Sequence, residues 1–254
     1  MRAGEILALV YFVLVGGAAL ALLRRRAGAT IALGWALTGV LISATASVAP
    51  AVLRDWWLIV ALPLAYWAPA RLVGSANERL ERWLQSIDDT LGLARPDPAG
   101  HSLLEFAYFL VYPMVPAGLL AITFSNPAMA AEFWLVLLAA VLPCYGLLPL
   151  LPTRPPRAFL LPAASAGDAS RLFRRANVTF LATFGNAWNT LPSGHAAGAA
   201  SVAVMVWRSG SPLAPAFLLL AIGIAMGTVR GRYHYMIDTA SGVLLGLAVA
   251  GLLR

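Results

Sequence analysis

Long apolar runs separated by short polar turns make up most of this chain. Runs near the length of a bilayer crossing lie at residues 5–23, 29–49, 56–74, 102–123, 129–151, 195–208, 213–230 and 234–253. A helix needs about 20 mainly apolar residues to cross the hydrocarbon core of a membrane, and the sixth run is short by that measure. The pattern predicts an all-α polytopic membrane protein with about eight transmembrane helices.

Two polar stretches interrupt these runs. In residues 75–100, apolar side chains recur with the period of a helix and charged side chains lie between them, which predicts an amphipathic helix in the plane of the membrane interface. This helix either gathers or gates lipid or, as we favour, connects two spans while its apolar face packs on the bundle. Residues 152–194 form the longest polar loop, and a loop of this length in a compact bundle is usually functional.

Composition agrees with a membrane protein. Hydrophobic residues make up 60% of the chain, charged residues make up 11%, and the mean hydropathy is +0.78, which excludes an ordinary soluble domain. Arg24, Arg25 and Arg26 follow the first run and no small-residue cleavage site precedes them, so we expect a retained span there. The single cysteine, Cys144, lies inside a predicted span, which excludes a disulfide and argues against a metal–thiolate cluster.

The candidate chemistry is concentrated in two histidine motifs. In the first, Ser193 and Gly194 precede His195; in the second, Asp238 follows His234 by four residues. The second spacing puts both side chains on one face of a helix, where the carboxylate can fix the imidazole tautomer and leave the other nitrogen free as nucleophile or base. The Ser193 hydroxyl and the Gly194 N–H are suited to an oxyanion. The alternative, two satisfied polar residues in a membrane bundle, accounts poorly for both motifs in this order.

Arginines are concentrated around the same motifs. Alternating topology puts the end of the fifth run, the start of the sixth and the end of the seventh on one side of the membrane, so their side chains can converge. The arginines concerned are Arg154, Arg157, Arg230 and Arg232. Arginine binds phosphate oxygens bidentately, which makes these four the candidate phosphate ligands. Positively charged helix ends that need no substrate are the alternative, but they do not explain the coincidence with both histidines.

The two histidine motifs together resemble the membrane-bound type-2 phosphatidic acid phosphatase superfamily, whose site is similar to that of vanadium haloperoxidases. The resemblance covers roughly residues 100–253. It implies a phosphohistidine mechanism in which His234 attacks the phosphorus, Asp238 orients it and His195 protonates the leaving lipid oxygen. It also implies that arginines, with Ser193 and the Gly194 N–H, hold the phosphate oxygens. No metal or other cofactor is required in that scheme.

Two family motifs are incomplete in this chain. Arg154 and the proline after it fit the end of the first motif, but Leu147 stands where the family has lysine. Thr228 stands where the third motif begins with arginine, so Arg230 or Arg232 would have to substitute for it. These departures leave the superfamily assignment unchanged.

These departures resemble the branch of the superfamily that contains inositol phosphorylceramide synthases. That branch has a proline-rich segment like the one that begins at Pro152, and a tyrosine pair like Tyr108 and Tyr112. It also has a histidine flanked by tyrosines, as His234 is here. The resemblance implies that Arg157 matters at least as much as Arg154.

The expected function is that of an integral membrane lipid phosphatase, which hydrolyses a phosphate ester or diphosphate of a lipid. The alternative enzyme is a lipid headgroup phosphotransferase, which needs the same site and differs only in the acceptor. A non-catalytic lipid-binding or transport protein is a further alternative, but we find none of the paired repeats that transporters usually have. The expected partners are a phospholipid or polyprenyl phosphate and the lipid bilayer, with no nucleic acid. The oligomeric state and the identity of the lipid stay open.

We divide the chain into N-terminal membrane spans at residues 1–74, an interfacial segment at 75–100 and a catalytic membrane core at 101–254. The family resemblance implies a six-helix phosphatase core with two extra N-terminal spans. We expect a multi-pass protein of the cell inner membrane with an extracytoplasmic site. The arginine distribution argues the other way, because 14 of the 18 arginines fall on the site side and positive loops favour the cytoplasm.

Overall fold

The computed structural model describes residues 1–93, 101–159 and 170–253, and in these ranges the regular secondary structure is helical apart from one isolated antiparallel bridge between Thr153 and Asn189. The prediction of an all-α protein is confirmed. In chain order the helices are α1 (Ala3–Leu22), α2 (Ala29–Thr45), η1 (Ala46–Val48), α3 (Ala51–Trp57), η2 (Leu58–Val60), α4 (Ala61–Ala70), α5 (Glu78–Thr90), α6 (His101–Phe109), α7 (Val111–Ser125), η3 (Pro127–Met129), α8 (Ala130–Gly146), η4 (Pro156–Phe159), α9 (Ser170–Phe184), α10 (Gly194–Arg208), α11 (Ala214–Arg230) and α12 (Met236–Leu252).

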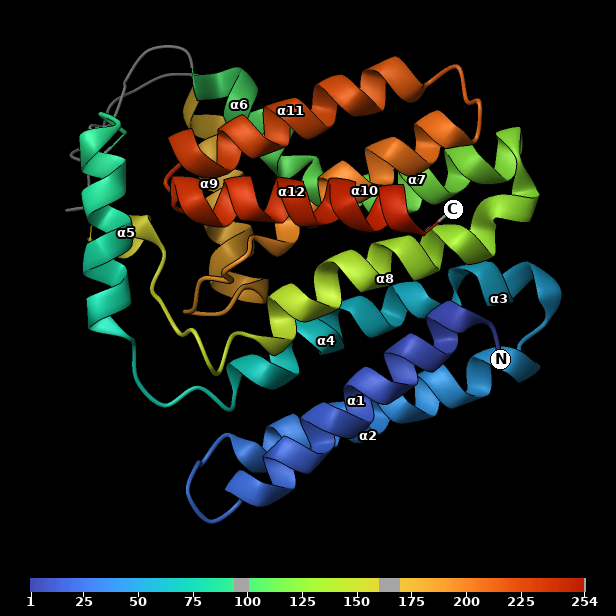
Figure 1. Cartoon of the computed structure of the whole chain (residues 1–254), viewed down its shortest axis with the longest axis horizontal. Coiled ribbons are helices and arrows are strands. Elements are labelled where there is room, and N and C mark those ends of the chain that lie inside the picture. The colour runs from blue at the N-terminus through green and yellow to red at the C-terminus, as the bar shows by residue number, and fades with distance from the viewer. Residues whose placement is uncertain (94–100, 160–169, 254) are drawn as a thin grey trace.

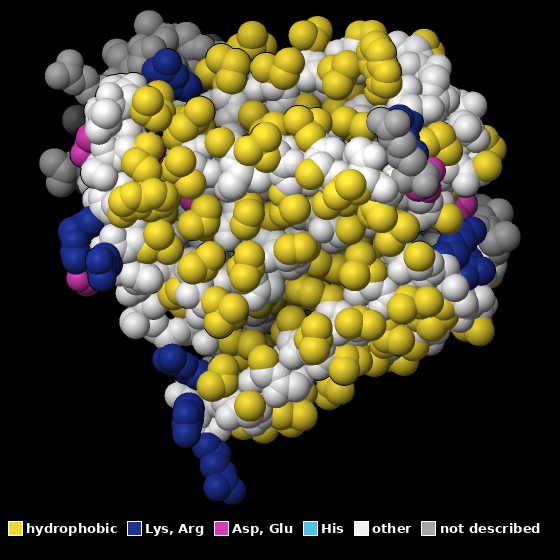
Figure 2. All heavy atoms as spheres, in the orientation of Figure 1, with side chains coloured by type: hydrophobic (Ala, Val, Ile, Leu, Met, Phe, Trp, Pro, Cys, Tyr) yellow, Lys and Arg dark blue, Asp and Glu magenta, His cyan; other side chains and the backbone are white. Residues whose placement is uncertain are grey.

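Several helices are suited to a membrane. Among the described residues, three helices are long and apolar enough to cross one, namely Ala3–Leu22, Ala29–Val48 and Pro127–Gly146, and α6 with α7 adds a fourth if this pair, bent by 57°, is one span. The apolar helices α11 and α12 are shorter, at 17 residues each. Large hydrophobic side chains are exposed over much of the molecule (Figure 2). The chain is a helical, polytopic membrane protein.

The predicted third span is not one continuous helix. It is divided into α3, the 3₁₀ turn η2 and α4. Pro63 has no N–H to donate to the carbonyl group of Ile59, so one helical hydrogen bond is lost where η2 ends and α4 begins.

The polar stretch 152–194 contains a helix that we did not predict. Helix α9 presents Phe173 and Phe180 to the bundle, where their ring centroids lie 4.7 Å from that of Phe106 and 3.9 Å from that of Tyr112. The arginines between these aromatic residues hide the helical period in the sequence. Residues 160–169 of the stretch lie outside the described residues.

Helix α10 lies inside the bundle, and α12 lies beside it (Figure 1). Glycines make this close approach possible, because a Cβ atom at Gly242 or Gly246 would overlap the carbonyl oxygen of Ser193 or Ala197. The contact brings the first turn of α12 next to the start of α10, where His195 is located.

Helices α1 and α2 form a hairpin that packs on α4 and α8. Their connecting loop lies at the same end of the molecule as α5 and the start of α12 (Figure 1). A Cβ atom at Gly74 would overlap the side chain of Arg26. The hairpin loop therefore contacts the segment that leads into α5. The arginines of this loop and the candidate site therefore lie toward the same end of the molecule.

Candidate active site

A small polar pocket of about 20 Å³ lies at this end of the bundle. It is lined by the segment after α8, the residues before α10, the start of α10 and the loop of residues 231–235, together with side chains of α4, α6, α8 and α9. The polar side chains that line it include Arg157, Asn189, Thr190, His195, Tyr233 and His234. Both histidines of the sequence motifs are therefore in one pocket.

The two histidines contact each other. The Nδ1 atom of His195 lies 3.3 Å from the Nε2 atom of His234. The other nitrogen of His234, Nδ1, lies 3.7 Å from Oδ2 of Asp238, and the His234 side chain is only 6% exposed. Sequence spacing predicts that His234 and Asp238 share a helix face, but α12 begins at Met236. The carboxylate instead reaches back from the first turn of α12 to the loop that carries His234.

Burial and the positive charge of Arg157 lower the pKa of His234 to about 3. Desolvation is the larger cause, because an imidazolium ion loses its hydration in a buried site. His234 is therefore neutral at neutral pH, which leaves a lone pair for a nucleophile or base.

Asp238 is completely buried and is held by two hydrogen bonds to one oxygen. Its Oδ2 accepts from Asn189 Nδ2 at 2.6 Å and from the Tyr235 N–H at 2.9 Å. Asn189 is placed by its bridge to Thr153. Nothing in the local sequence singles out Asn189, because its role depends on this bridge between distant segments.

Arg157 is the candidate phosphate ligand that reaches the pocket with both histidines. Its backbone N–H donates to the carbonyl oxygen of Arg232 at 3.0 Å, and its guanidinium carbon lies 5.5 Å from the ring centroid of Tyr233. No carboxylate in the described ranges forms an ion pair with it. Its guanidinium is thus available to an anion.

The other three arginines lie elsewhere. Arg154 makes a bidentate ion pair with Glu81, at 3.1 and 2.7 Å, and Arg232 pairs with Asp88 at 2.8 Å. Arg230 is exposed at the end of α11. Arg232 is one of the four candidate phosphate ligands, but its guanidinium is bound by a carboxylate of α5.

The Ser193 hydroxyl and the Gly194 N–H both form hydrogen bonds with other groups of the protein. Ser193 caps α10, where its Oγ accepts from the Ala196 N–H at 3.3 Å, and the Gly194 N–H donates to Thr190 Oγ1 at 3.1 Å. A Cβ atom at Gly194 would overlap the Tyr145 ring, so this close packing requires glycine. Thr190, which sequence reasoning missed, lines the pocket itself.

Helix α5 differs from our expectation of an apolar packing face. Leu84 is buried, but so are two acids, Glu81 and Asp88, while Trp83 and Leu91 are about half exposed. Burial raises the pKa of Asp88, and the Met236 N–H and the Arg232 guanidinium oppose this rise. The pKa of Glu81 is lowered: burial raises it, but hydrogen bonds from Arg154 outweigh that effect. The buried face of α5 is thus largely ionic.

Aromatic rings enclose His195. Tyr108 stacks on Tyr233 with their ring centroids 4.0 Å apart. The rings of Tyr108 and Tyr112 meet the His195 ring edge-on, at 5.5 and 6.0 Å. The tyrosine pair and the tyrosine that precedes His234, both noted in the sequence, therefore meet at the same site.

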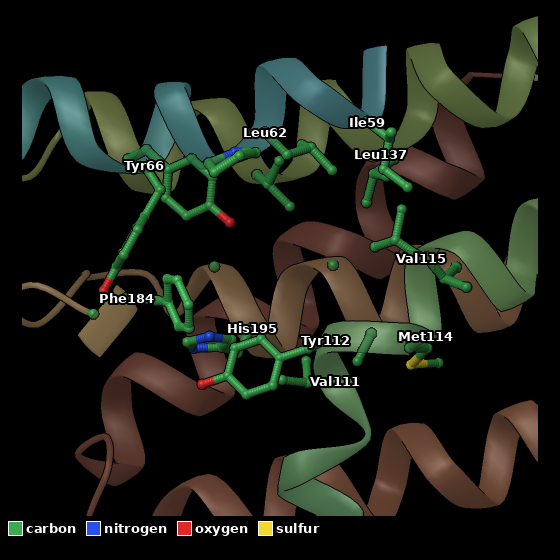
Figure 3. Close-up of a pocket in the computed structure, with 18 of the residues that line it drawn as sticks. Ile59, Leu62, Tyr66, Val111, Tyr112, Met114, Val115, Leu137, Phe184 and His195 are labelled. Atoms are coloured by element: carbon green, nitrogen blue, oxygen red, sulfur yellow. The ribbon is translucent and has the colours of Figure 1, made fainter. Parts of the chain in front are cut away.

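A second, apolar cavity of about 380 Å³ begins at His195 (Figure 3). Side chains of α4, α7, α8, α9 and α10 line it. His195, Tyr112 and Phe184 lie at one end and Ile59 and Leu137 at the other (Figure 3). His195 also lines the polar pocket, as do Tyr66, Tyr145 and Leu181, so the two spaces adjoin.

Comparison with known protein families agrees with the geometry. A family model described as the PAP2 superfamily matches residues 79–252. The chain belongs to the PAP2 superfamily. The matched range begins in α5 and includes the whole histidine site, and membership supports phosphatase-type activity on phosphate esters. No curated protein and no solved structure matches the chain.

The donor set of this PAP2 superfamily member is suited to phosphoryl transfer. It combines a neutral imidazole, a second imidazole within hydrogen-bond distance, a buried carboxylate and an arginine that pairs with no carboxylate of the described residues. Within residues 1–93, 101–159 and 170–253, no three His, Cys, Asp or Glu side chains are placed to hold a metal ion.

Proposed function

We propose that this PAP2 superfamily member is a lipid phosphate phosphatase that works through a phosphohistidine on His234. The observation that carries the proposal is the junction of an apolar cavity and a polar pocket at His195. A phosphate ester with a long apolar tail fits such a junction, with its tail in the cavity and its phosphate beside Arg157. The cavity volume of about 380 Å³ lies in the usual range for small-molecule sites.

The proposed reaction has two steps. In the first, the Nε2 lone pair of His234 forms a bond to phosphorus and the bond between phosphorus and the lipid oxygen breaks. His195, which enters this step as an imidazolium ion beside the bound phosphate dianion, gives the lipid oxygen its proton and becomes neutral. Arg157 stabilises charge on the phosphoryl oxygens, and Asp238 stabilises the charged imidazole ring. In the second, water attacks the phosphohistidine and gives a proton to His195. The products are the lipid alcohol and inorganic phosphate.

Transfer of the phosphoryl group to a polyol or lipid alcohol would use the same phosphohistidine, as in a headgroup phosphotransferase of the inositol phosphorylceramide synthase branch. Hydrolysis and transfer share His234, His195 and Arg157, so the acceptor assay below separates them.

We also place the site on the extracytoplasmic face of the cell inner membrane, as the family resemblance implies. The C-terminus lies at the end of the molecule away from α5 (Figure 1), so it would face the cytoplasm. Alkaline phosphatase fused after the last residue should therefore be inactive in cells. An active fusion would put the site in the cytoplasm, as the arginine distribution favours.

The activity is tested by offering the purified protein phosphatidate and polyprenyl diphosphate, each with and without an acceptor alcohol, while free phosphate and new lipids are measured. Phosphate release without acceptor supports the phosphatase. A new lipid formed only with acceptor supports the transferase, and no turnover of any phosphate ester contradicts both.

The tail site is tested by filling the cavity. Val115 lines it at the end away from His195 (Figure 3), so Val115→Trp should lower kcat/KM for long-chain lipid phosphates and spare a tail-free aryl phosphate. Val10→Trp is the matched control, because Val10 is about half exposed on α1. Equal losses for both substrates would show that the cavity does not hold the tail.

A further inference from the structure

Two acids of α5 point into the protein, toward segments that carry the candidate site. Glu81 and Asp88 are seven residues apart and lie on the same face of the helix, at 2% and 0% exposure. Each pairs with an arginine of a different segment, Glu81 with Arg154 and Asp88 with Arg232. A buried carboxylate is costly unless it is paired and hydrogen-bonded, so these contacts fix α5 in one position against the site.

Asp88 holds the loop of the nucleophile on both sides. Its Oδ2 accepts from Arg232 Nη1 at 2.8 Å, and its Oδ1 accepts from the Met236 N–H at 3.1 Å. These two residues stand two positions before and two positions after His234. The Asp88 carboxylate therefore ties together the two ends of the loop that carries His234.

Asp88 also acts on the phosphate side of the pocket through Arg232. The backbone of Arg232 has φ of 61°, a left-handed conformation that a non-glycine residue rarely adopts without support from its surroundings. The carbonyl oxygen of this residue accepts from the Arg157 N–H at 3.0 Å. The Arg232 guanidinium also donates to the carbonyl oxygen of Leu93 at 3.1 Å. Asp88 therefore holds Arg232 directly, and through the backbone of Arg232 it also helps to hold Arg157 in place.

We propose that Asp88 is a positioning residue for phosphoryl transfer, which holds His234 and Arg157 in their reactive arrangement although it touches neither substrate nor phosphate. This proposal rests on the proposed function. Arg232, in turn, serves as the intermediary between α5 and the site and not as a phosphate ligand. The α5 helix is then part of the catalytic unit and not a connector between spans.

The test compares Asp88→Asn with Asp89→Asn, its exposed neighbour, in purified protein that gives a single folded species. The Asp88→Asn side chain keeps an oxygen for the Met236 N–H but presents an amide, in place of a carboxylate, to Arg232. We expect kcat for lipid phosphate to fall on the order of tenfold or more, with KM changed by less than about threefold, because the tail cavity is untouched. Asp89→Asn should stay within about twofold of wild type.

Asp88→Glu is the conservative variant, and it should recover part of the lost kcat because it restores the charge at a longer reach. It also serves where Asp88→Asn does not fold. A kcat of Asp88→Asn equal to wild type, or a loss confined to folded yield and thermal stability, would overturn the positioning role.

Hydrogen exchange of the 231–236 segment separates failure of this proposal from failure of the proposed function. Asp88→Asn should speed exchange there and Asp89→Asn should not. If the wild type hydrolyses no phosphate ester, the proposed function fails, and the exchange rates still decide whether Asp88 holds the loop. Unchanged exchange in Asp88→Asn would reject the proposal whatever the activity.

Discussion

The Nδ1 atom of His195 lies 3.3 Å from the Nε2 atom of His234, although the two residues are 39 positions apart in the chain. This contact joins the start of α10 to the loop before α12. At this distance one ring can donate a hydrogen bond to the other, so the protonation state of the ring that is to attack depends on that of the ring that is to donate a proton. The roles of the two histidines can be separated by the choice of leaving group.

His234→Ala should abolish turnover of every substrate, because His234 is the proposed nucleophile. His195→Ala should strongly slow a lipid phosphate, whose alkoxide leaves poorly, and should largely spare an aryl phosphate, whose leaving group needs little protonation. Steady-state kinetics with both substrates measures the difference. Normal turnover of an aryl phosphate by His234→Ala would mean that the nucleophile is another residue.

Arg157→Lys should lower kcat/KM on the order of tenfold or more, because lysine keeps the charge but loses the planar fork that binds two phosphoryl oxygens. Arg230→Lys is the matched control, since Arg230 is exposed at the end of α11 and should tolerate the change. Orthovanadate inhibition constants, measured in parallel, should rise for Arg157→Lys only. If Arg157→Lys is near wild type while Arg154→Lys is inactive, the phosphate is held as in the general superfamily pattern.

Asn189→Ala should lower kcat on the order of tenfold, because Asp238 loses a hydrogen-bond donor at 2.6 Å and a buried group without its partner costs about 1–3 kcal/mol. The buried carboxylate then orients the His234 ring less well. Asn126→Ala, at an exposed position at the end of α7, controls for the loss of an asparagine. Equal kcat values for both variants would show that Tyr235 alone holds Asp238 in place.

The pattern of apolar and polar residues was enough to predict the position of most apolar helices. Apolar runs predicted α1, α2, α8, α10, α11 and α12 closely, because lipid-facing and core-facing helices are both apolar along their length. The run that contains Pro63 was predicted as one helix, since hydropathy does not register a missing N–H. Helix α9 was missed because its aromatic face only becomes apparent when α6 and α7 are there to cover it.

The candidate site divides in the same way. His195, His234 and Asp238 could be found from short motifs, and they do lie together. The partners of the arginines could not, because Glu81 is 73 residues from Arg154 and Asp88 is 144 residues from Arg232. Charge alone marks all these arginines as candidates for phosphate, and only the packing of α5 separates those that carboxylates already hold.

Activity should survive a chelator and be inhibited by orthovanadate. Within the described parts of the chain no three His, Cys, Asp or Glu side chains are placed to hold a metal ion, and Oδ2 of Asp238 is already bonded to Asn189 and Tyr235. Vanadate takes a trigonal-bipyramidal form that can bond to a histidine nitrogen. His234→Ala should therefore fail to bind vanadate and should also be inactive. Phosphate release measured before and after EDTA treatment decides the matter. A loss that magnesium or zinc restores would contradict a metal-independent reaction.

The low pKa of His234 predicts how stability depends on pH. Its pKa is lowered to about 3 in the folded protein, by burial and by Arg157, whereas an unfolded chain has a value of about 6.5. Between these two values the unfolded chain binds a proton that the folded protein does not, so the contribution of His234 to stability is present above about pH 6.5 and is lost as the pH falls toward 3. The limiting slope is about 1.4 kcal/mol per pH unit.

His234→Gln has no group that binds this proton in the unfolded chain, so the Tm of the wild type relative to the variant should fall as the pH is lowered from 7.5 to 4.5 in detergent. A Tm difference that is independent of pH would mean that His234 keeps an ordinary pKa, and its neutral state at the start of the reaction would need another explanation.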